Sequence, residues 1–529
     1  MANVQLFQTL KGKFLPPANA FNAEMAPAYE MSPRHQLAQY AATGCLNATY
    51  YANAETQLAT VLELCAQVDA GFIAQTAIYC RERGYMKDMP ALLAAVLAAK
   101  GAPELVPVFK RVINNGKMLR NFVQILRSGA AGRRSLGTRP KKLVQAWLNQ
   151  ASEAQLLAAA VGNAPSLADV IKMVHPKPSE AWREAFFAWG IGKPHDAQAL
   201  PQAVRDLEAY KLDQSLPVPQ VPFQMLTALP LSAQAWAAIA RQGGWQMVRM
   251  NLNTFARNGV FALPGMTELI ADKLRDADAI TKAGVFPYQL MAAYKAASDE
   301  VPPAIRAALQ DALEIALSNV PQIDGGVVIC PDVSGSMQSP VSGYRGSATS
   351  TMRCIDVAAL VAAAMLRKNP DAQVVPFEVA VVKCKLNSRD SVMSNAEKLA
   401  AVGGGGTNCS APLALLNRDK VRANLVVYVS DNESWIDARP GATATMREWT
   451  VYKARNPQAR LVCIDCVPNR TSQMAEREDV LNIGGFSDDV FKIIAAFGAG
   501  QLGADHWVGK IASVTVQEAA WAGSSVQEN

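Results

Sequence analysis

The sequence predicts an α + α/β protein, in which an N-terminal helical-repeat domain is followed by a doubly wound, Rossmann-like α/β domain. Amphipathic helical segments recur to about residue 320 without a convincing strand run. The periodicity then changes at residues 320–324, and strand and helix segments alternate beyond it. The 529 residues exceed one typical domain, and a half-apolar composition with 18% charged residues provides an ample core.

The helical part begins after an extended entry segment of about 30 residues. Apolar residues fall at i, i+3, i+4 and i+7, and Pro, Gly or Asp separates the segments. Two helices per roughly 40 residues suggest a HEAT-type α-solenoid, which can curve into a crescent or ring. An irregular helical bundle is the alternative. The expected helices span residues 55–67, 70–83, 89–99, 104–114, 119–127, 140–150, 153–160, 167–173, 179–189, 200–210, 232–242, 245–257, 265–275, 287–297 and 302–318.

The second part alternates strands and helices, which predicts a parallel sheet covered on both faces. Strands are expected at residues 326–331, 373–377 with a hairpin partner at 379–384, 424–430, 460–466 and 480–483. Helices are expected at residues 353–368, 394–401, 411–416, 442–454 and 487–497. The predicted domains are 1–320, 321–510 and a tail, 511–529, that contains a strand-like piece at 513–516.

Five polar side chains give the strongest chemical signal, because each follows an apolar strand run or a glycine-rich loop. The runs are 325–331 and 424–430, and the loop is 403–406. Open parallel sheets bind ligands at the carboxyl ends of their strands. Two carboxylates and three hydroxyls suit a divalent cation, with Mg²⁺ expected, and leave a sixth position for water or an incoming carboxylate. The candidate metal ligands are Asp332, Ser334, Ser336, Thr407 and Asp431.

This pattern resembles the metal-ion-dependent adhesion site of von Willebrand factor A (vWA) domains at all five positions. The resemblance implies that Ser334, Ser336 and Thr407 ligate the metal directly, whereas the two aspartates act mostly through water. A chance turn is the alternative reading, since Asp and Ser are ordinary turn residues.

Composition indicates a soluble, cytoplasmic protein. The N-terminus has no apolar signal-peptide core, and no run of about 18 apolar residues is present. Nine scattered cysteines fit a reducing compartment. The pair Cys463 and Cys466 has no second pair for zinc and does not open a helix as a redox motif would, so both are expected to be buried thiols.

Basic charge is concentrated in the N-terminal part. Residues 1–320 hold 31 Lys and Arg against 24 Asp and Glu, a balance of +7, so the remainder of the +6 chain carries −1. Between Glu104 and Glu153 there is no acid. Such a surface favours a phosphate polymer, although a solvated helix face is the alternative. The ten cations of this basic window are Lys110, Arg111, Lys117, Arg120, Arg127, Arg133, Arg134, Arg139, Lys141 and Lys142.

His175 lies among cations at a predicted helix end, between Lys172 and Lys177. It could stack on a base or donate to a phosphate, or it could simply cap the helix. The sequence contains no helix-turn-helix, zinc-finger or basic-zipper signature for a DNA groove. The expected polymer is therefore RNA or single-stranded.

Seven segments along the chain are similar to those of the Ro autoantigen family, whose members join a ring of helical repeats, the TROVE domain, to a vWA domain. The resemblance extends over roughly residues 30–500. The segments are 44–51 (GCLNATYY), 79–90 (YCRERGYMKDMP), 249–253 (RMNLN), 332–337 (DVSGSM), 405–410 (GGTNCS), 430–434 (SDNES) and 484–487 (GGFS).

The resemblance implies an RNA-binding protein and no enzyme. Family members bind small noncoding Y RNAs on the outer basic surface of the ring and hold single-stranded 3′ ends of misfolded RNAs through the central hole. They act in RNA quality control, and Y RNA links bacterial members to an exoribonuclease. We therefore expect a monomeric protein within a ribonucleoprotein.

The segment around His175 matches a family segment with a histidine used in Y RNA binding. Ala158 and Gly162 stand here where animal members suggest cations. Lys172, Lys177 and the basic window are expected to replace them.

Two other functions compete with RNA binding. A metal-dependent protein receptor or scaffold would use the adhesion site to capture a partner's carboxylate, but it would not need the basic window. A two-metal nuclease would need several clustered carboxylates, and only two acids accompany the three hydroxyls.

Overall fold

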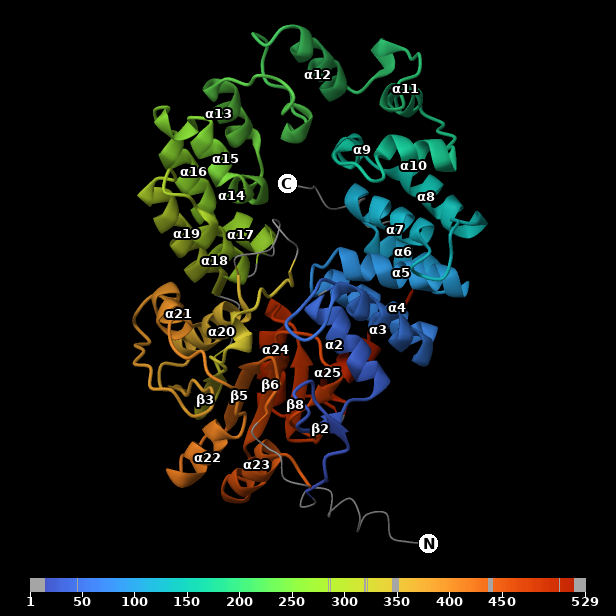
Figure 1. The fold of residues 1–529 in the computed structure, drawn as a ribbon. Helices are drawn as coiled ribbons and strands as arrows, with labels where there is room; N and C mark the ends of the chain where they lie inside the picture. Colours follow the sequence, from blue (N-terminus) through green and yellow to red (C-terminus); the bar gives the residue numbers. More distant parts are fainter. Residues whose placement is uncertain are drawn as a thin grey trace. The chain divides into compact units, whose positions relative to one another are not determined.

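The computed structural model describes residues 15–44, 46–283, 285, 287–317, 320, 322–344, 352–435, 441–503 and 505–517 (Figure 1). By internal packing the chain divides into two compact units. The first contains Met1–Phe72, Val285–Lys295 and Leu313–Val514, and the second contains Ile73–Gly284, Ala296–Ala312 and Thr515–Asn529. These units do not follow the predicted boundaries at 320 and 510, because described residues of the N-terminal segment, such as Gln39, contact the α/β sheet.

The centre of the first unit is a five-stranded sheet with the strand order β4-β3-β5-β6-β8. Every neighbouring pair is parallel, and the order changes direction at β3. The predicted doubly wound sheet is thus confirmed. Its strands are β3 (Val327–Pro331), β4 (Gln373–Val374), β5 (Leu425–Ser430), β6 (Arg460–Asp465) and β8 (Val480–Gly484).

Helices cover both faces of this sheet. On one face, alternate strand residues such as Val328 and Val426 pack with Leu413 of α22 and with Met446 and Trp449 of α23. On the other face, α20 packs against β3, β5 and α21, while α24 packs against β6. The helices are α20 (Cys354–Lys368), α21 (Val392–Ala400), α22 (Ala411–Arg418), α23 (Ala444–Arg455) and α24 (Asp488–Gly498).

Helix α2 (Pro33–Thr43) has no counterpart among the elements expected from the sequence. Three of its buried side chains are the polar residues His35, Gln36 and Gln39, so it lacks an apolar stripe. Gln39 Nε2 donates to Asp465 Oδ2 over 3.0 Å, at the end of β6, and His35 Nε2 lies 3.1 Å from the Asn482 carbonyl of β8. The helix therefore lies over the carboxyl ends of these strands.

The first unit also contains a three-stranded antiparallel sheet of order β1-β2-β7. Its members are β1 (Ala20–Phe21), β2 (Pro27–Glu30) and β7 (Thr471–Ser472), which are too short to show alternation. Helices α3 (Ala54–Gln67), α18 (Pro287–Ala296) and α25 (His506–Ala512) complete the unit, and the last of these was also not expected.

Three local predictions are wrong. No hairpin strand forms at 379–384, where a single antiparallel bridge joins Phe377 to Val381 within tight turns. Residues 513–516 contain no strand, because they follow the end of α25 as a turn. The helix expected at 245–257 is divided at Asn251, whose φ and ψ of −118° and 19° are not helical.

The second unit is all-helical among the described residues. Most helices pack against close neighbours in sequence: α5 against α6 and α7, α7 against α9, and α10 against α11. This is the packing of a helical-repeat array, whose ring closure stays a prediction. The helices are α4 (Ala70–Glu82), α5 (Asp88–Lys100), α6 (Leu105–Val112), α7 (Gly116–Ser128), α8 (Thr138–Gln150), α9 (Glu153–Ala160), α10 (Leu167–Val174), α11 (Ala181–Gly190), α12 (Gln202–Leu212), α13 (Ala233–Gln242), α14 (Trp245–Met250), α15 (Leu252–Arg257), α16 (Met266–Arg275) and α17 (Ala277–Ala283), with α19 (Pro303–Ala316) shared between the units.

Gly116 allows α7 to approach α9 closely. A Cβ atom at this position would lie 2.2 Å from Ala159 Cβ and 2.4 Å from Ala159 Cα. We expect Gly116→Ala to destabilise the second unit by about 1–3 kcal/mol, because the two helices must separate. Gly190→Ala in α11 is the matched control, since its Cβ would meet nothing within 4 Å. Equal chemical-denaturation midpoints for the two variants would contradict this prediction.

The structure also bears on two expectations from composition, which concern the cysteines and membrane-spanning segments. The eight described cysteines are free, and Cys463 and Cys466 are buried, which raises the pKa of both thiols well above the usual range. Cys45 lies outside the described residues.

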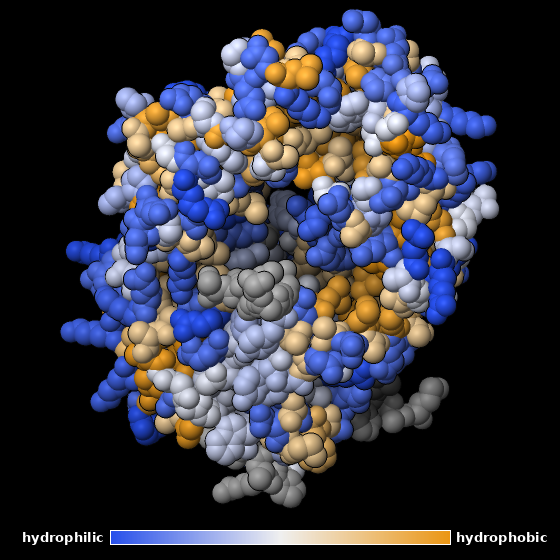
Figure 2. Space-filling model, turned by 45° about the horizontal axis from the view of Figure 1, so that its top comes forward, coloured by the Kyte–Doolittle hydropathy of each residue, from blue (hydrophilic) through white to orange (hydrophobic). Residues whose placement is uncertain are grey.

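Within the described chain, no helix has the length and apolar character needed to cross a membrane. Figure 2 shows hydrophilic residues over much of one face, with hydrophobic residues between them.

Candidate metal centre and basic cleft

The sheet brings two of the predicted metal ligands together. Asp332 directly follows β3 and Asp431 directly follows β5, and these strands are parallel neighbours. The register continues beyond the strand, since the Asp332 amide donates to the Val429 carbonyl over 2.9 Å. Both carboxylates therefore lie at the carboxyl edge of the sheet, at the strand where the sheet order reverses.

Hydrogen bonds orient the aspartates and the two serines. Asp332 Oδ1 accepts from the Ser334 amide over 2.8 Å, which closes a turn that places the Ser334 side chain at the site. Asp332 Oδ2 accepts from the Ser430 hydroxyl over 2.5 Å. Ser334 Oγ lies 3.3 Å from Ser336 Oγ, and the Ser336 side chain lies close enough to Asp431 to affect its pKa. Four of the five predicted ligands thus form one cluster, in which hydrogen bonds join Asp332, Ser334 and Ser336.

The glycine-rich loop brings Thr407 to the same region. The Gly404 amide donates to the Val333 carbonyl over 2.9 Å, and the Gly335 amide donates to the Gly405 carbonyl over 2.8 Å. Gly403 has φ +86°, and a Cβ there would lie 2.2 Å from the Val333 carbonyl oxygen, so only glycine fits. Thr407 is buried next to these contacts.

The Thr407 carbonyl also accepts from the Trp435 amide over 3.3 Å, which ties the threonine to the loop that follows Asp431. Its neighbour Gly406 lies under the Trp435 indole, whose Nε1 would be 2.4 Å from an added Cβ. The fifth ligand candidate therefore lies between the other two loops, although its hydroxyl is not part of the hydrogen-bonded cluster.

The electrostatics of the site favour a cation. Burial raises the pKa of Asp332, and burial together with the Asp332 charge raises the pKa of Asp431 to about 7. Neither carboxylate belongs to an ion pair of the described residues. A bound cation would compensate two buried charges that no side chain compensates.

Two further buried acids near the site gave no signal in the sequence. Burial, followed by the Asp431 charge, raises the pKa of Glu433 to about 8, and burial also raises the pKa of Asp465 well above the usual range. Their places, two residues after Asp431 and at the end of β6, could have marked them as edge residues.

The donor set fits Mg²⁺ because all five predicted side chains offer oxygen. Within the described chain, no three His, Cys, Asp or Glu side chains group to hold a metal, so the site depends on its hydroxyls. The identity and presence of the metal, like the five ligand roles, stay predictions.

The thirteen predicted RNA-binding residues lie in the second unit, on or between α6, α7, α8 and α10 or just after α10. Some of these residues already form hydrogen bonds within the protein. Arg111 forms two 2.8 Å hydrogen bonds to Glu82. Arg133 and Arg139 donate to carbonyls at the C-terminal end of α5, including Ala98 at 3.2 Å and Ala102 at 2.9 Å. These three arginines therefore have a structural role, which the run of cations alone did not indicate.

Other cations are exposed. The exposed set is Lys117, Arg127, Arg134, Lys142, Lys172, His175 and Lys177, together with part of Arg139, whereas Lys110, Arg120 and Lys141 are half-buried. The exposed residues gather on neighbouring helices, since α10 packs against both α7 and α8. The structure thus groups Lys172 and His175 with the basic window.

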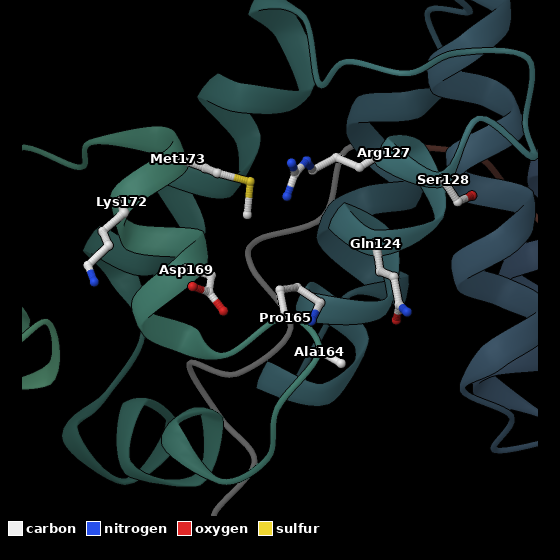
Figure 3. A pocket seen from close by; sticks show the side chains of 8 residues that line it. All are labelled: Gln124, Arg127, Ser128, Ala164, Pro165, Asp169, Lys172 and Met173. Carbon is white, nitrogen blue, oxygen red and sulfur yellow. The ribbon is translucent and has the colours of Figure 1, made fainter.

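A cleft of about 570 Å³ lies between α7 and α10 (Figure 3). Arg127 lines it from α7 and Lys172 from α10, and Met173 and Pro165 give it an apolar wall. In Figure 3 the Arg127 side chain points toward Met173, whereas the Lys172 side chain points away from Arg127. The remaining lining residues are Gln124, Ser128, Ala164 and Asp169. Asp169 is occupied as a helix cap, because its carboxylate accepts from the Ser166 amide and hydroxyl over 2.9 and 2.7 Å. Hydrogen bonds from Ser166, followed by the charges of Lys172 and Arg127, lower the pKa of Asp169, so the cleft combines two cations near one carboxylate with an apolar surface.

Arg120 lies one helical turn before Gln124, on the same face of α7. Its guanidinium occupies the space over Gly162, where an added Cβ would lie 2.8 Å from Nη1 and Nη2. Burial lowers the pKa of Arg120, and its Nη1 has no hydrogen-bond partner among the described residues. A neighbouring helix thus supplies a cation where residue 162 has none.

His175 terminates α10 with its backbone in the left-handed region, at φ +50°. Its amide donates to the Ile171 carbonyl over 2.9 Å, so the main chain supplies the helix cap. The imidazole is exposed on the same surface as Lys172. The helix cap therefore does not involve the His175 side chain.

Comparison with known proteins matches this architecture. Residues 327–498 match the family model described as the Ro60 vWA domain. The chain is 25% identical over 513 residues to the RNA-binding protein RO60 of Deinococcus radiodurans, covering 90% of this chain and 94% of that protein. The crystal structure of the D. radiodurans RO (RSR) protein has the same fold, with a TM-score of 0.61 and 21% identity over 89% of this chain and all of that one. Residues 327–498 thus form a vWA domain of the Ro60 type, and the chain as a whole is similar to the D. radiodurans RO60 protein in sequence and fold.

Proposed function

We propose that this chain is a non-enzymatic RNA-binding protein. The grouping of exposed cations around the cleft of α7 and α10 carries this proposal, and the name of the D. radiodurans relative supports it. Arg127, Lys142, Lys172 and Lys177 would neutralise phosphates and release counterions. Because α10 packs against both α7 and α8, one RNA strand could contact all of these cations.

The cleft fits an unpaired nucleotide better than a duplex. Met173 and Pro165 offer an apolar surface for a base, and the Gln124 amide can hydrogen-bond a base edge. Arg127 and Lys172 are placed for the flanking phosphates. The unpartnered Nη1 of Arg120 could donate to a further phosphate, which would remove the cost of a buried donor without an acceptor.

The finer function follows from the family resemblance. The protein would bind small noncoding Y RNA on this basic surface and hold single-stranded ends of misfolded RNA in its helical ring. It would act in RNA quality control in the cytoplasm, as a monomer in a ribonucleoprotein that RNA bridges to an exoribonuclease. The exposed side chain of His175 would contact the Y RNA.

The metal site would bind a ligand rather than catalyse a reaction. Ser334, Ser336 and Thr407 would hold Mg²⁺ directly, and Asp332 and Asp431 would balance its charge. When bound, the metal would attract an oxygen ligand such as a carboxylate. Glu433 and Asp465 lie near the two predicted carboxylate ligands, but within the described chain no three His, Cys, Asp or Glu side chains group to hold a metal, which argues against two-metal phosphoryl transfer.

A filter-binding titration tests the proposed function. Three nucleic acids are compared at several salt concentrations: a stem-loop RNA with a single-stranded 3′ tail, the same RNA without the tail, and duplex DNA. We expect the tailed RNA to bind at least about tenfold more tightly than the DNA, with a steep salt dependence. Weak and equal binding of all three would overturn the proposal and favour the metal-dependent protein receptor.

A further inference from the structure

The chain between α2 and α3 lies against the candidate metal site. Asn47 Nδ2 donates to the Ser342 carbonyl over 2.9 Å, and the Tyr344 amide donates to the Ala48 carbonyl over 2.7 Å. Ser342 and Tyr344 belong to the loop that continues from the metal-site serines. We call residues 46–52 the cover segment. Because α2 crosses the carboxyl edge of the sheet, it delivers this segment to the side of the edge where the metal site lies.

Tyr51 of the cover segment reaches the site itself. Its hydroxyl lies close enough to the Ser336 side chain and to the Asp431 and Glu433 carboxylates for all three to affect the pKa of Tyr51. The side chain is half-buried. The adjacent Tyr50 is 60% exposed and contacts Tyr51 edge to face, with ring centroids 4.9 Å apart. Of these two neighbouring tyrosines, only Tyr51 contacts the metal-site residues through its hydroxyl.

The local fold holds Tyr51 in this position. The Thr49 amide donates to the Ala52 carbonyl over 2.7 Å, which closes a turn around the two tyrosines. Gln57 of α3 donates to Thr49 Oγ1 over 3.2 Å and ties this turn to the following helix. Because these contacts hold the segment at both ends, keeping the Tyr51 hydroxyl beside Ser336 costs little further conformational entropy.

Ser336 connects Tyr51 to the other ligands. Its hydroxyl lies 3.3 Å from Ser334 Oγ, and its side chain lies close enough to Asp431 and Tyr51 to affect the pKa of both. A serine that ligates a cation through its oxygen still has one proton to donate, and Asp431 can accept it. The Tyr51 hydroxyl then remains next to the coordination sphere, where it can ligate the cation.

We propose that Tyr51 is a positioning residue of the metal site, which fills the open coordination position from within the chain and restricts entry of an external carboxylate. This inference rests on the metal site in the proposed function and is independent of RNA binding. The cover segment makes the site selective, because a carboxylate ligand must displace the Tyr51 hydroxyl.

Luminescence lifetimes of bound Tb³⁺, excited directly and measured in H₂O and D₂O, test this role because they report the number of metal-bound waters. Tb³⁺ serves as an oxygen-seeking probe ion in the full-length protein. We expect Tyr51→Phe to gain about one bound water relative to the unsubstituted protein. Titration with acetate should then show several-fold tighter carboxylate binding in this variant. Tyr50→Phe is the matched control and should equal the unsubstituted protein in both measurements.

Equal water numbers and equal acetate affinities for Tyr51→Phe and the unsubstituted protein would overturn the proposal. Absence of a saturable Tb³⁺ site in the unsubstituted protein would overturn it together with the metal site, whereas the RNA titration would be unaffected. Tyr51→Leu, which removes both the hydroxyl and the ring, should give the same gain in bound water. A gain confined to one of the two variants would also count against a role for the hydroxyl.

Discussion

Arg127→Glu combined with Lys172→Glu is expected to weaken binding of the tailed RNA by about tenfold or more and to reduce the magnitude of its salt slope by about two. The two cations line the cleft from α7 and α10, so a strand passing through it would contact both. Each neutralised phosphate contributes close to one unit to the slope of log affinity against log salt. Filter binding at several salt concentrations measures both effects.

The matched control is Arg257→Glu with Lys282→Glu. These exposed cations lie in the same unit, on α15 and α17, and give the same change in net charge. We expect the control to keep most of the affinity and nearly the original slope. A comparable loss in both double variants would mean that overall charge, and not the cleft, determines binding.

The choice of residues matters because three arginines of the basic window stabilise the fold. Arg133 and Arg139 hydrogen-bond carbonyls at the end of α5, and Arg111 pairs with Glu82. Substituting them would leave acceptors or a carboxylate without a partner. Lower RNA affinity of such variants would not distinguish a lost phosphate contact from a loosened helix array.

Removal of divalent cations is expected to destabilise the first unit increasingly as the pH rises from 5 to 8. The pKa of Asp431 is raised to about 7, whereas unfolded aspartate titrates near 4. A raised carboxyl pKa gives stability that is present below the unfolded value and is lost as the pH rises through the folded value. In chelator, the unfolding temperature should therefore fall over this range.

Added Mg²⁺ should reverse that loss, because metal binding requires the ionised carboxylates. At about 100 times its dissociation constant, the ion would stabilise the folded unit by about 2.7 kcal/mol. The gain in unfolding temperature should therefore be larger at pH 8 than at pH 5. Calorimetry in chelator and in Mg²⁺ at four pH values measures this difference.

Asp332→Asn should abolish the Mg²⁺-dependent gain, since it removes one of the two charges and keeps the size of the side chain. The amide can still accept from the Ser334 amide, so the turn is expected to persist. Asp371→Asn, at an exposed position of the same unit, is the control and should respond to Mg²⁺ as the unsubstituted protein does. An undiminished Mg²⁺ effect in Asp332→Asn would show that the ion stabilises the protein elsewhere.

The sequence by itself determined the features that depend on neighbouring residues. Apolar runs predicted β3, β5 and β6, and the 3.6-residue periodicity predicted most helices of the second unit, because burial of one face imposes a local pattern. Parallel strands share a carboxyl edge, so the positions of Asp332 and Asp431 after their strands were enough to predict that they meet.

Only the tertiary structure decided which polar side chains become partners across long stretches of chain. Helix α2 is stabilised by Gln39 and Asp465, which are 426 residues apart, and its placement delivers Tyr51 to the metal site. Likewise, the run of cations did not reveal that Arg133 caps α5 or that Arg120 lies over Gly162. The sequence around a polar residue does not identify its hydrogen-bond partner, because a hydrogen bond depends on where the fold places both atoms.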